Sequence, residues 1–194
     1  MEVEKSFDSR LGVVEILKNS SRLSESPTVW IALSLIIVYA ALSVIGGSFL
    51  SLNLRVAYPL VQDNSAVWRG AFWMLFTAMF LHADIVHLGG NLIFLLIFGT
   101  SLEEQTSRGR WFTVYFTSGL VGNLFFLLLG GDAAGLGASG AIWGLLGAAG
   151  GLRGLVGMMF YAGMNLFAGG GFLAHAGGLV AGLCFRYLLI KRAH

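Results

Sequence analysis

Four polar side chains of the types needed for acyl-transfer chemistry lie within strongly apolar stretches of this sequence. They are Ser139, His175, His87 and Asn91. A serine hydroxyl becomes a nucleophile when a histidine takes its proton, and further hydrogen-bond donors must then hold the oxyanion that forms. Because polar groups inside a membrane are costly, each of them marks a candidate site. The residue types therefore make a serine-based hydrolysis the first hypothesis.

Ser139 lies between glycines at the start of an apolar stretch, Gly137–Gly147. Glycines at four-residue spacing, such as Gly140 and Gly144, also form an ordinary packing face between transmembrane helices. Taken alone, this stretch fits helix packing better than catalysis. The catalytic interpretation depends on whether the other polar residues reach the same place.

The composition indicates a polytopic membrane protein. Hydrophobic residues make up 56% of the 194 residues, charged residues only 11%, and the net charge is +2. The mean hydropathy of +0.78 is far above that of a soluble domain. Basic residues occur in short clusters between apolar runs, a pattern of topology signals rather than of nucleic-acid binding. The single cysteine, Cys184, excludes a disulfide within the chain.

Apolar runs predict an all-α fold with six transmembrane helices in residues 28–194, preceded by a polar, cytoplasmic tail over residues 1–27. An additional aromatic-rich run over residues 70–81 is predicted to be interfacial or re-entrant. The six expected spans cover residues 28–52, 85–102, 111–129, 139–152, 155–167 and 174–190.

The distribution of basic residues supports an even number of spans, with both termini in the cytoplasm of a multi-pass cell-membrane protein. Arg55 and Arg69 are the two basic residues on the expected outer side. Ten lie on the expected inner side: Lys5, Arg10, Lys18, Arg22, Arg108, Arg110, Arg153, Arg186, Lys191 and Arg192.

Helix rise places Ser139 and His175 at similar depth. Ser139 precedes Arg153 by 14 residues, about 21 Å, and His175 precedes Lys191 by 16 residues, about 24 Å. With both basic residues at the inner face of a core about 30 Å thick, the serine lies roughly 9 Å and the histidine roughly 6 Å below the outer face.

The second expected span adds two more groups to that half of the membrane. His87 and Asn91 are four residues apart and so share one helix face. Asp84 and Asp132 are expected near the outer surface, and no carboxylate falls at the depth of the serine on the fourth or sixth span. A Ser-His dyad is therefore expected rather than a triad.

Two other chemistries fit less well. A zinc site would need His82, His87 and His175 together, but no His-Glu-x-x-His pattern exists, and a spacing of five places His82 and His87 on different helix faces. A soluble nucleophile elbow needs glycine where Ala141 stands. We therefore expect neither a metal nor another cofactor.

Three separated motifs resemble those of the rhomboid intramembrane serine proteases, and they occur in the family's order. The motifs are His82-x4-His87-x3-Asn91, Gly137-Ala138-Ser139-Gly140 and Ala174-His175-Ala176-Gly177-Gly178. The resemblance covers the chain from the first expected span to the sixth and implies a six-helix rhomboid bundle.

The resemblance also implies roles for individual residues. Ser139 would be the nucleophile and His175 its general base, while His87 and Asn91 would donate to the oxyanion. Trp143 occupies the position of an aromatic residue that packs on the histidine in this family. The motif residues His82, Gly137 and Gly178 would support the site, Gly178 by letting the fourth and sixth helices approach closely.

Other positions match or depart from the family pattern. Gly99 and Glu103 resemble a structural pair of the family. Trp73-Met74 stands where the family commonly has Trp-Arg, and Trp68-Arg69 is the same dipeptide in a different register. Ser139 and His175 are also only 36 residues apart. The fifth span and its neighbouring loops are therefore short, and in this family that region is linked to lateral substrate entry.

Taken together, the sequence predicts an intramembrane endopeptidase that cuts transmembrane protein substrates near the outer face of the lipid bilayer. The alternative is an inactive rhomboid-like protein that binds transmembrane clients without cutting them. A channel or transporter has only the glycine content in its favour, and helix packing already explains that content.

Overall fold

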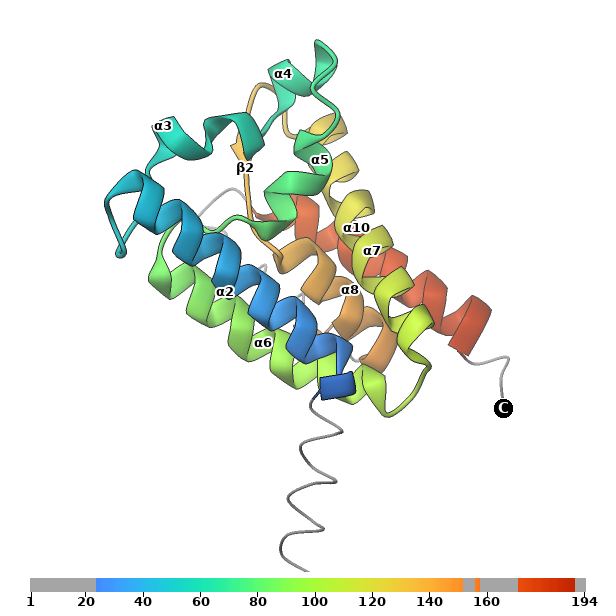
Figure 1. The fold of residues 1–194 in the computed structure, drawn as a ribbon. Coiled ribbons are helices and arrows are strands. Elements are labelled where there is room, and N and C mark those ends of the chain that lie inside the picture. The colour runs from blue at the N-terminus through green and yellow to red at the C-terminus, as the bar shows by residue number, and fades with distance from the viewer. Residues whose placement is uncertain (1–23, 152–155, 158–170, 191–194) are drawn as a thin grey trace, which may run out of the picture.

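The computed structural model describes residues 24–151, 156–157 and 171–190. Most of these residues are helical (Figure 1). The longer helices are α2 (Pro27–Gly46), α6 (Ile85–Glu103), α7 (Arg108–Leu129), α8 (Ser139–Gly150) and α10 (Phe172–Phe185), which continues as one π-helical turn (Arg186–Ile190). The short elements are α3 (Leu54–Ala57), η1 (Tyr58–Leu60), β1 (Gln62–Asp63), α4 (Asn64–Trp68), α5 (Met74–Thr77), η2 (Ala78–Phe80) and β2 (Ala134–Gly135).

Three of the described helices, α2, α6 and α7, are long and apolar enough to cross a membrane. This confirms a largely helical membrane protein. Helices α8 and α10 are shorter, at 12 and 14 residues. The predicted fifth span, residues 155–167, falls almost entirely outside the described residues, as does the predicted tail up to residue 23.

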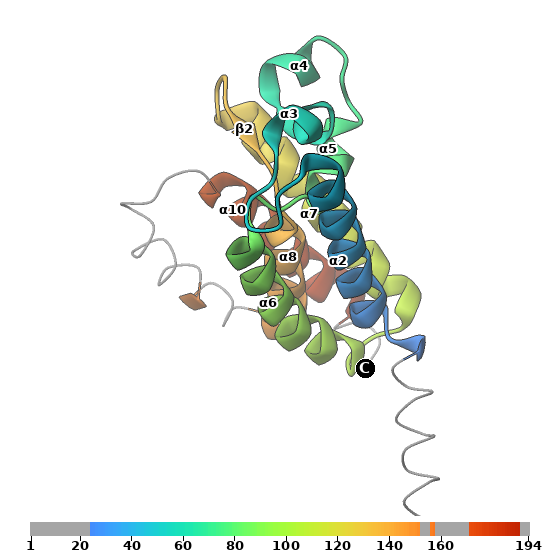
Figure 2. The ribbon, with the colours of Figure 1, turned by 60° about the vertical axis from the view of Figure 1, so that its left-hand side comes forward.

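Helix α8 occupies the middle of the bundle and contacts α6, α7 and α10 (Figures 1 and 2). Helix α2 packs on the other side of α6. The main apolar core lies along these contacts, and Leu95 of α6, Tyr115 of α7 and Leu145 of α8 are completely buried in it. The helix that begins with Ser139 is thus held on several sides.

Helices α8 and α10 approach each other backbone to backbone. A side chain at Gly178 would overlap the carbonyl of Gly140, and one at Gly182 would overlap the carbonyl of Gly144. No residue larger than glycine fits these two positions without a shift of one helix. Small residues at membrane helix interfaces permit contacts of this kind.

The C-terminal end of α6 is hydrogen-bonded to the start of α2. The Glu103 carboxylate accepts hydrogen bonds from the Ser26 hydroxyl at 2.7 Å and from the Thr28 N–H at 2.8 Å. A side chain at Gly99 would collide with Thr28, and the Gly99 carbonyl accepts a hydrogen bond from the Trp111 indole. The Gly99 and Glu103 pair therefore joins α2, α6 and α7.

The first helix ends earlier than predicted. The sequence placed its end at Leu52, but α2 stops at Gly46 because Gly47 adopts a left-handed conformation with φ of 69°. The Gly47 N–H then donates to the Val44 carbonyl and the Ser48 N–H donates to the Ser43 carbonyl, which caps the last turn. Residues beyond it belong to a structured connection rather than to the span.

That connection, residues 47–81, contains an element that an all-α prediction did not include. Strand β1 pairs antiparallel with β2, which lies just before α8. The Asn64 side chain donates to the carbonyls of Phe126 and Gly131, and Gln62 donates to the carbonyl of Asn123. The Gln62 and Asn64 side chains are themselves buried, and their hydrogen bonds tie the connection to the end of α7 and to the segment leading into Ser139.

Aromatic and hydroxyl groups complete the attachment of this connection. The Trp73 indole donates to the Pro59 carbonyl, and the Thr77 hydroxyl donates to the Leu60 carbonyl. Met74, which replaces the arginine of the family pattern, is buried among apolar neighbours. Outside the spans, hydrogen bonds from the Tyr58 hydroxyl and a backbone N–H lower the pKa of Asp63, the N-cap of α4.

Candidate active site

Ser139 is the first residue of α8, and the backbone before it can be built only with glycine. Gly137 has a φ of 131°, a conformation that residues with a side chain rarely adopt. Its N–H donates to the Ala78 carbonyl, which fixes the entry into the helix. The first N–H groups of a helix have no partner within it, so backbone donors are available at the start of α8.

His175 and Ser139 are brought into direct contact. The Nε2 atom of His175 lies 2.6 Å from the Ser139 hydroxyl oxygen. His175 is buried near the start of α10, where its ring packs over Gly171. The Trp143 ring stacks on the His175 ring with a centroid distance of 5.7 Å and an angle of 28° between the planes. Packing on two sides thus orients the imidazole toward the serine.

His87 reaches the site from α6 with its own orientation fixed. The Asp84 carboxylate accepts a hydrogen bond from the His87 N–H at 2.7 Å and so caps α6. The Ala83 N–H donates to the ring Nδ1 at 3.4 Å, which leaves Nε2 as the protonated nitrogen of the neutral ring. A Cβ atom at Gly137 would lie 3.2 Å from this Nε2 and 3.7 Å from the Ser139 hydroxyl oxygen. The donor nitrogen and the serine therefore flank the same point.

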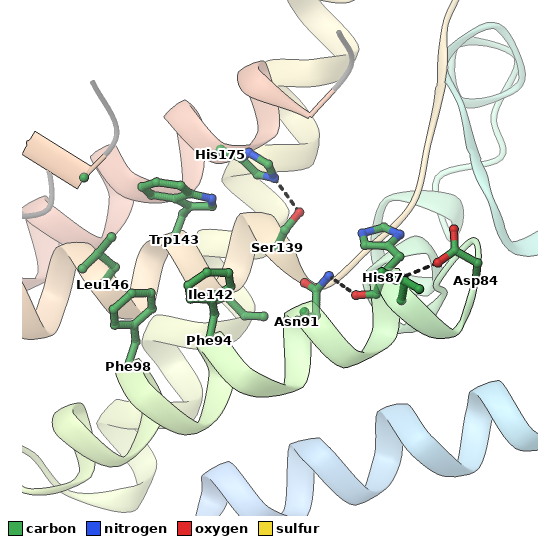
Figure 3. A pocket seen from close by; sticks show the side chains of 13 residues that line it. Asp84, His87, Asn91, Phe94, Phe98, Ser139, Ile142, Trp143, Leu146 and His175 are labelled. Atoms are coloured by element: carbon green, nitrogen blue, oxygen red, sulfur yellow. Dashed lines mark hydrogen bonds between the residues drawn. The ribbon is translucent and has the colours of Figure 1, made fainter. Parts of the chain in front are cut away.

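Asn91 lies one helical turn further along the same face of α6. Its side-chain nitrogen donates one hydrogen bond to the His87 carbonyl at 2.9 Å, and the residue is 7% exposed. An amide nitrogen carries two hydrogens, so one remains after this bond is made. Figure 3 shows Asn91 between His87 and the wall that carries Ser139.

His82 is close to His87, contrary to the prediction that the two would lie on different helix faces. The chain is extended after Leu81, so His82 precedes α6 rather than lying on it. The two rings meet edge to face with centroids 5.1 Å apart. His82 is almost completely buried, and this burial lowers its pKa to about 3. His82 therefore supports the His87 ring as a neutral group and lies outside the residues that line the cavity.

A cavity of about 960 Å³ lies between α6 and α8 and includes all four of the candidate residues (Figure 3). One end of it is polar, with Ser139, His175, His87 and Asn91. Its other end is apolar, with Phe94, Phe98 and Leu146. A peptide that entered this space would lie against the Ser139 hydroxyl while its apolar side chains face the phenyl rings.

The sequence analysis did not include several residues that line this cavity. On α6 the lining residues Asp84, His87, Asn91, Phe94 and Phe98 recur at three- and four-residue spacing, so they form one face. That spacing was readable from the sequence. Asp84 was expected near the outer surface, and the structure places it at the polar end of the cavity.

Metal binding has no structural support in the described part of the chain. No group of three or more His, Cys, Asp or Glu side chains in that part is arranged to hold an ion. His82, His87 and His175 do not form one cluster, because His82 is turned into the protein beneath His87.

Comparison with known proteins identifies the family. A family model described as the Rhomboid domain matches residues 69–152, which include His87, Asn91 and Ser139 but not His175. Rhomboid-like protease 3 of Toxoplasma gondii is 36% identical over 124 residues, covering 61% of this chain and 45% of that protein.

Two further relatives are also rhomboid proteins of similar identity. RHOMBOID-like protein 6, mitochondrial, of Arabidopsis thaliana is 35% identical over 136 residues, or 62% of this chain and 44% of that protein. Rhomboid protease GluP of Bacillus subtilis is 35% identical over 113 residues, or 58% of this chain and 22% of that protein. The chain thus matches less than half the length of each relative. These matches show that it belongs to the rhomboid family.

Proposed function

We propose that this protein is an intramembrane serine endopeptidase of the rhomboid type, which hydrolyses peptide bonds in transmembrane protein substrates. The observation that carries the proposal is the 2.6 Å contact between His175 Nε2 and the Ser139 hydroxyl oxygen at the wall of a cavity. A serine whose hydroxyl contacts an oriented imidazole is the arrangement that nucleophilic catalysis requires. Names of relatives that contain the word protease support the same class of activity.

In the first half of the reaction, His175 Nε2 removes the proton of the Ser139 hydroxyl as its oxygen attacks the scissile carbonyl carbon. The resulting oxyanion accepts hydrogen bonds from His87 Nε2–H, from the remaining N–H of Asn91 and from the backbone at Ser139. Such preorganised donors are typically the largest single contribution to catalysis. Collapse of the intermediate breaks the carbon–nitrogen bond, and His175 gives its proton to the leaving amine.

In the second half, a water molecule hydrolyses the ester between Ser139 and the substrate. His175 takes a proton from the water while the hydroxide attacks the ester carbonyl, and the Ser139 oxygen leaves with that proton. Water is absent from the hydrocarbon core, so this step requires a wetted cavity. The polar end of the cavity can hold such water because its side chains offer hydrogen bonds.

The positions of the charges support the proposed membrane setting. Among the described residues, Arg108, Arg110 and Arg186 lie toward one end of the bundle, and Arg55 and Arg69 lie in the connection at the other. We propose a six-helix bundle with both termini in the cytoplasm, so that the Ser139 end faces the extracellular side of a cell membrane. Substrates with weak helix formers near the cut, such as glycine, would unwind most easily into the site.

The test is cleavage of a panel of transmembrane substrates by the full chain in liposomes. Ser139→Ala and His175→Ala should each lower kcat at least 1,000-fold, since both groups act in one step. Ser118→Ala is the matched control, because Ser118 is fully buried on α7 away from the cavity. A fluorophosphonate should label wild type at Ser139 without any need for the right substrate.

Two outcomes would contradict the proposal. Equal cleavage by wild type and both variants would place the nucleophile elsewhere. Absence of both cleavage and labelling, together with stable binding of transmembrane clients, would instead support the inactive rhomboid-like alternative.

A further inference from the structure

The cavity has a full negative charge at one end only. Among its described lining residues, Asp84 is the one Asp, Glu, Lys or Arg side chain. It sits at the start of α6, next to the oxyanion donors His87 and Asn91. The opposite end of the lining is formed by Phe94, Phe98 and Leu146. A substrate in this cavity therefore meets a carboxylate near the scissile bond and phenyl rings farther away.

Only one oxygen of the Asp84 carboxylate is used within the described protein. Oδ1 accepts the hydrogen bond that caps α6, and no described residue bonds to Oδ2. Figure 3 shows this second oxygen turned away from the helix end. No salt bridge to Asp84 exists among the described residues, since the one ion pair found there joins Arg108 to Glu25. The charge of Asp84 is thus available to a bound molecule.

The dimensions fit a short stretch of extended substrate. Asp84 and Phe98 are 14 residues apart on α6, which corresponds to about 21 Å. An extended chain rises about 3.3 Å per residue, so roughly six residues would span this face. A transmembrane substrate offers a polar flank followed by an apolar segment, which matches the order of the two ends.

We propose that Asp84 is a specificity-determining residue that selects transmembrane substrates with lysine or arginine in the polar flank, within a few residues of the scissile bond. This inference rests on the proposed function and names the substrates of the same site. Opposite charges attract more strongly in a partly dry cavity than in bulk water, and a carboxylate there repels an acidic residue. Specificity then comes from attraction of substrates with a basic flank and rejection of substrates with an acidic flank.

The simpler role for Asp84 is to cap α6 and nothing more. Asparagine is an equally good N-cap, so Asp84→Asn keeps the hydrogen bond to the His87 N–H and removes only the charge. Asp132→Asn is the matched control. Asp132 is exposed, bonds to the Ser65 hydroxyl and does not line the cavity.

The experiment uses substrates that differ only in one flank residue, which is lysine, glutamine or glutamate at successive positions around the cut. Wild type should prefer lysine over glutamate by about tenfold in kcat/KM at one or two adjacent positions, and the preference should shrink as salt increases. Asp84→Asn should reduce this ratio to about one, while Asp132→Asn should keep the wild-type ratio. An unchanged ratio in Asp84→Asn would overturn the inference and leave the proposed protease activity intact.

A binding measurement separates this inference from catalysis. The same peptides are titrated in liposomes onto Ser139→Ala and onto the double variant Ser139→Ala, Asp84→Asn. The lysine peptide should bind about tenfold more tightly than the glutamate peptide to the first chain and equally well to the second. The same ratio of lysine-peptide to glutamate-peptide affinity in both chains would reject the role of Asp84 even if no substrate were cut.

Discussion

Helix α8 meets two of its neighbours, α10 and α6, in very different ways. Against α10 it packs backbone to backbone through Gly140 and Gly178, with no room for a methyl group. Against α6 it packs through core residues such as Leu145 on one side but leaves a cavity of about 960 Å³ on the other. The two residues of the proposed dyad lie across the tight contact, and the proposed oxyanion donors lie across the open one.

This difference separates two requirements of a hydrolytic site. Ser139 and His175 must stay within hydrogen-bond distance through the whole reaction, so rigid glycine packing suits them. The substrate must enter between the nucleophile and the donors, so the α6 side has to be open. A helix with one closed and one open face meets both requirements.

The largest effect on stability should come from a substitution that forces α8 and α10 apart. Gly178→Ala places a Cβ atom into the Gly140 backbone, which cannot move aside as a flexible side chain would. We expect a loss of about 3 kcal/mol in the free energy of unfolding, at the high end for overpacked sites. Thermal unfolding in detergent measures it.

Gly89→Ala provides the comparison at a glycine of α6 that has no close neighbour. Gly89 lies within α6, and a side chain there meets nothing within 4 Å. Alanine should raise the stability by roughly 0.5–1 kcal/mol, because it favours the helix. If both glycine variants unfolded at the same temperature, the close α8–α10 contact would not exist in the membrane protein.

A smaller effect should distinguish two neighbouring leucines of α8. Leu145 is 0% exposed in the core, while Leu146 lines the cavity. Leu145→Ala should cost about 2 kcal/mol or more through the hole it leaves, and Leu146→Ala should cost well under half of that. Equal losses in denaturation by a harsh detergent would mean that the cavity is filled by protein.

The smallest effect concerns the stack on His175. Trp143→Ala removes the ring that lies against the imidazole, and Trp143→Phe retains an aromatic surface there. Such contacts contribute about 1 kcal/mol, so kcat should fall roughly fivefold with alanine and less with phenylalanine. A change in KM alone, with kcat unchanged, would show that Trp143 binds substrate without orienting the histidine.

Much of this architecture was predictable because membrane segments carry strong sequence signals. The bounds of α6 and α7 follow directly from apolar runs and flanking charges. The similar depth of Ser139 and His175 stays a prediction from helix rise and basic residues, while the structure brings the two side chains into contact. Their catalytic roles stay a prediction that the variants above must test.

The parts that sequence reasoning missed depend on backbone geometry between helices. The sequence around Gln62 and Asn64 has no local signal for a short strand or for side-chain hydrogen bonds to a segment some 70 residues away. His82 was assigned to a helix face because the extended conformation after Leu81 has no clear signature. Asp84 was read as a surface residue because its position as an N-cap does not reveal that a cavity opens beside it.

The buried hydrogen bonds of Asn64 have a consequence for the length of α8. Twelve residues span about 18 Å, so this helix covers little more than half of a hydrocarbon core about 30 Å thick. In the proposed membrane setting, the irregular segment before Ser139 would fill the remaining depth, and its polar backbone groups could not face lipid. Asn64 and strand β1 satisfy several of those groups at Gly131, Ala133, Ala134 and Gly135. In that setting the connection between α2 and α6 would support this irregular segment, so that the serine could begin a helix below the membrane surface.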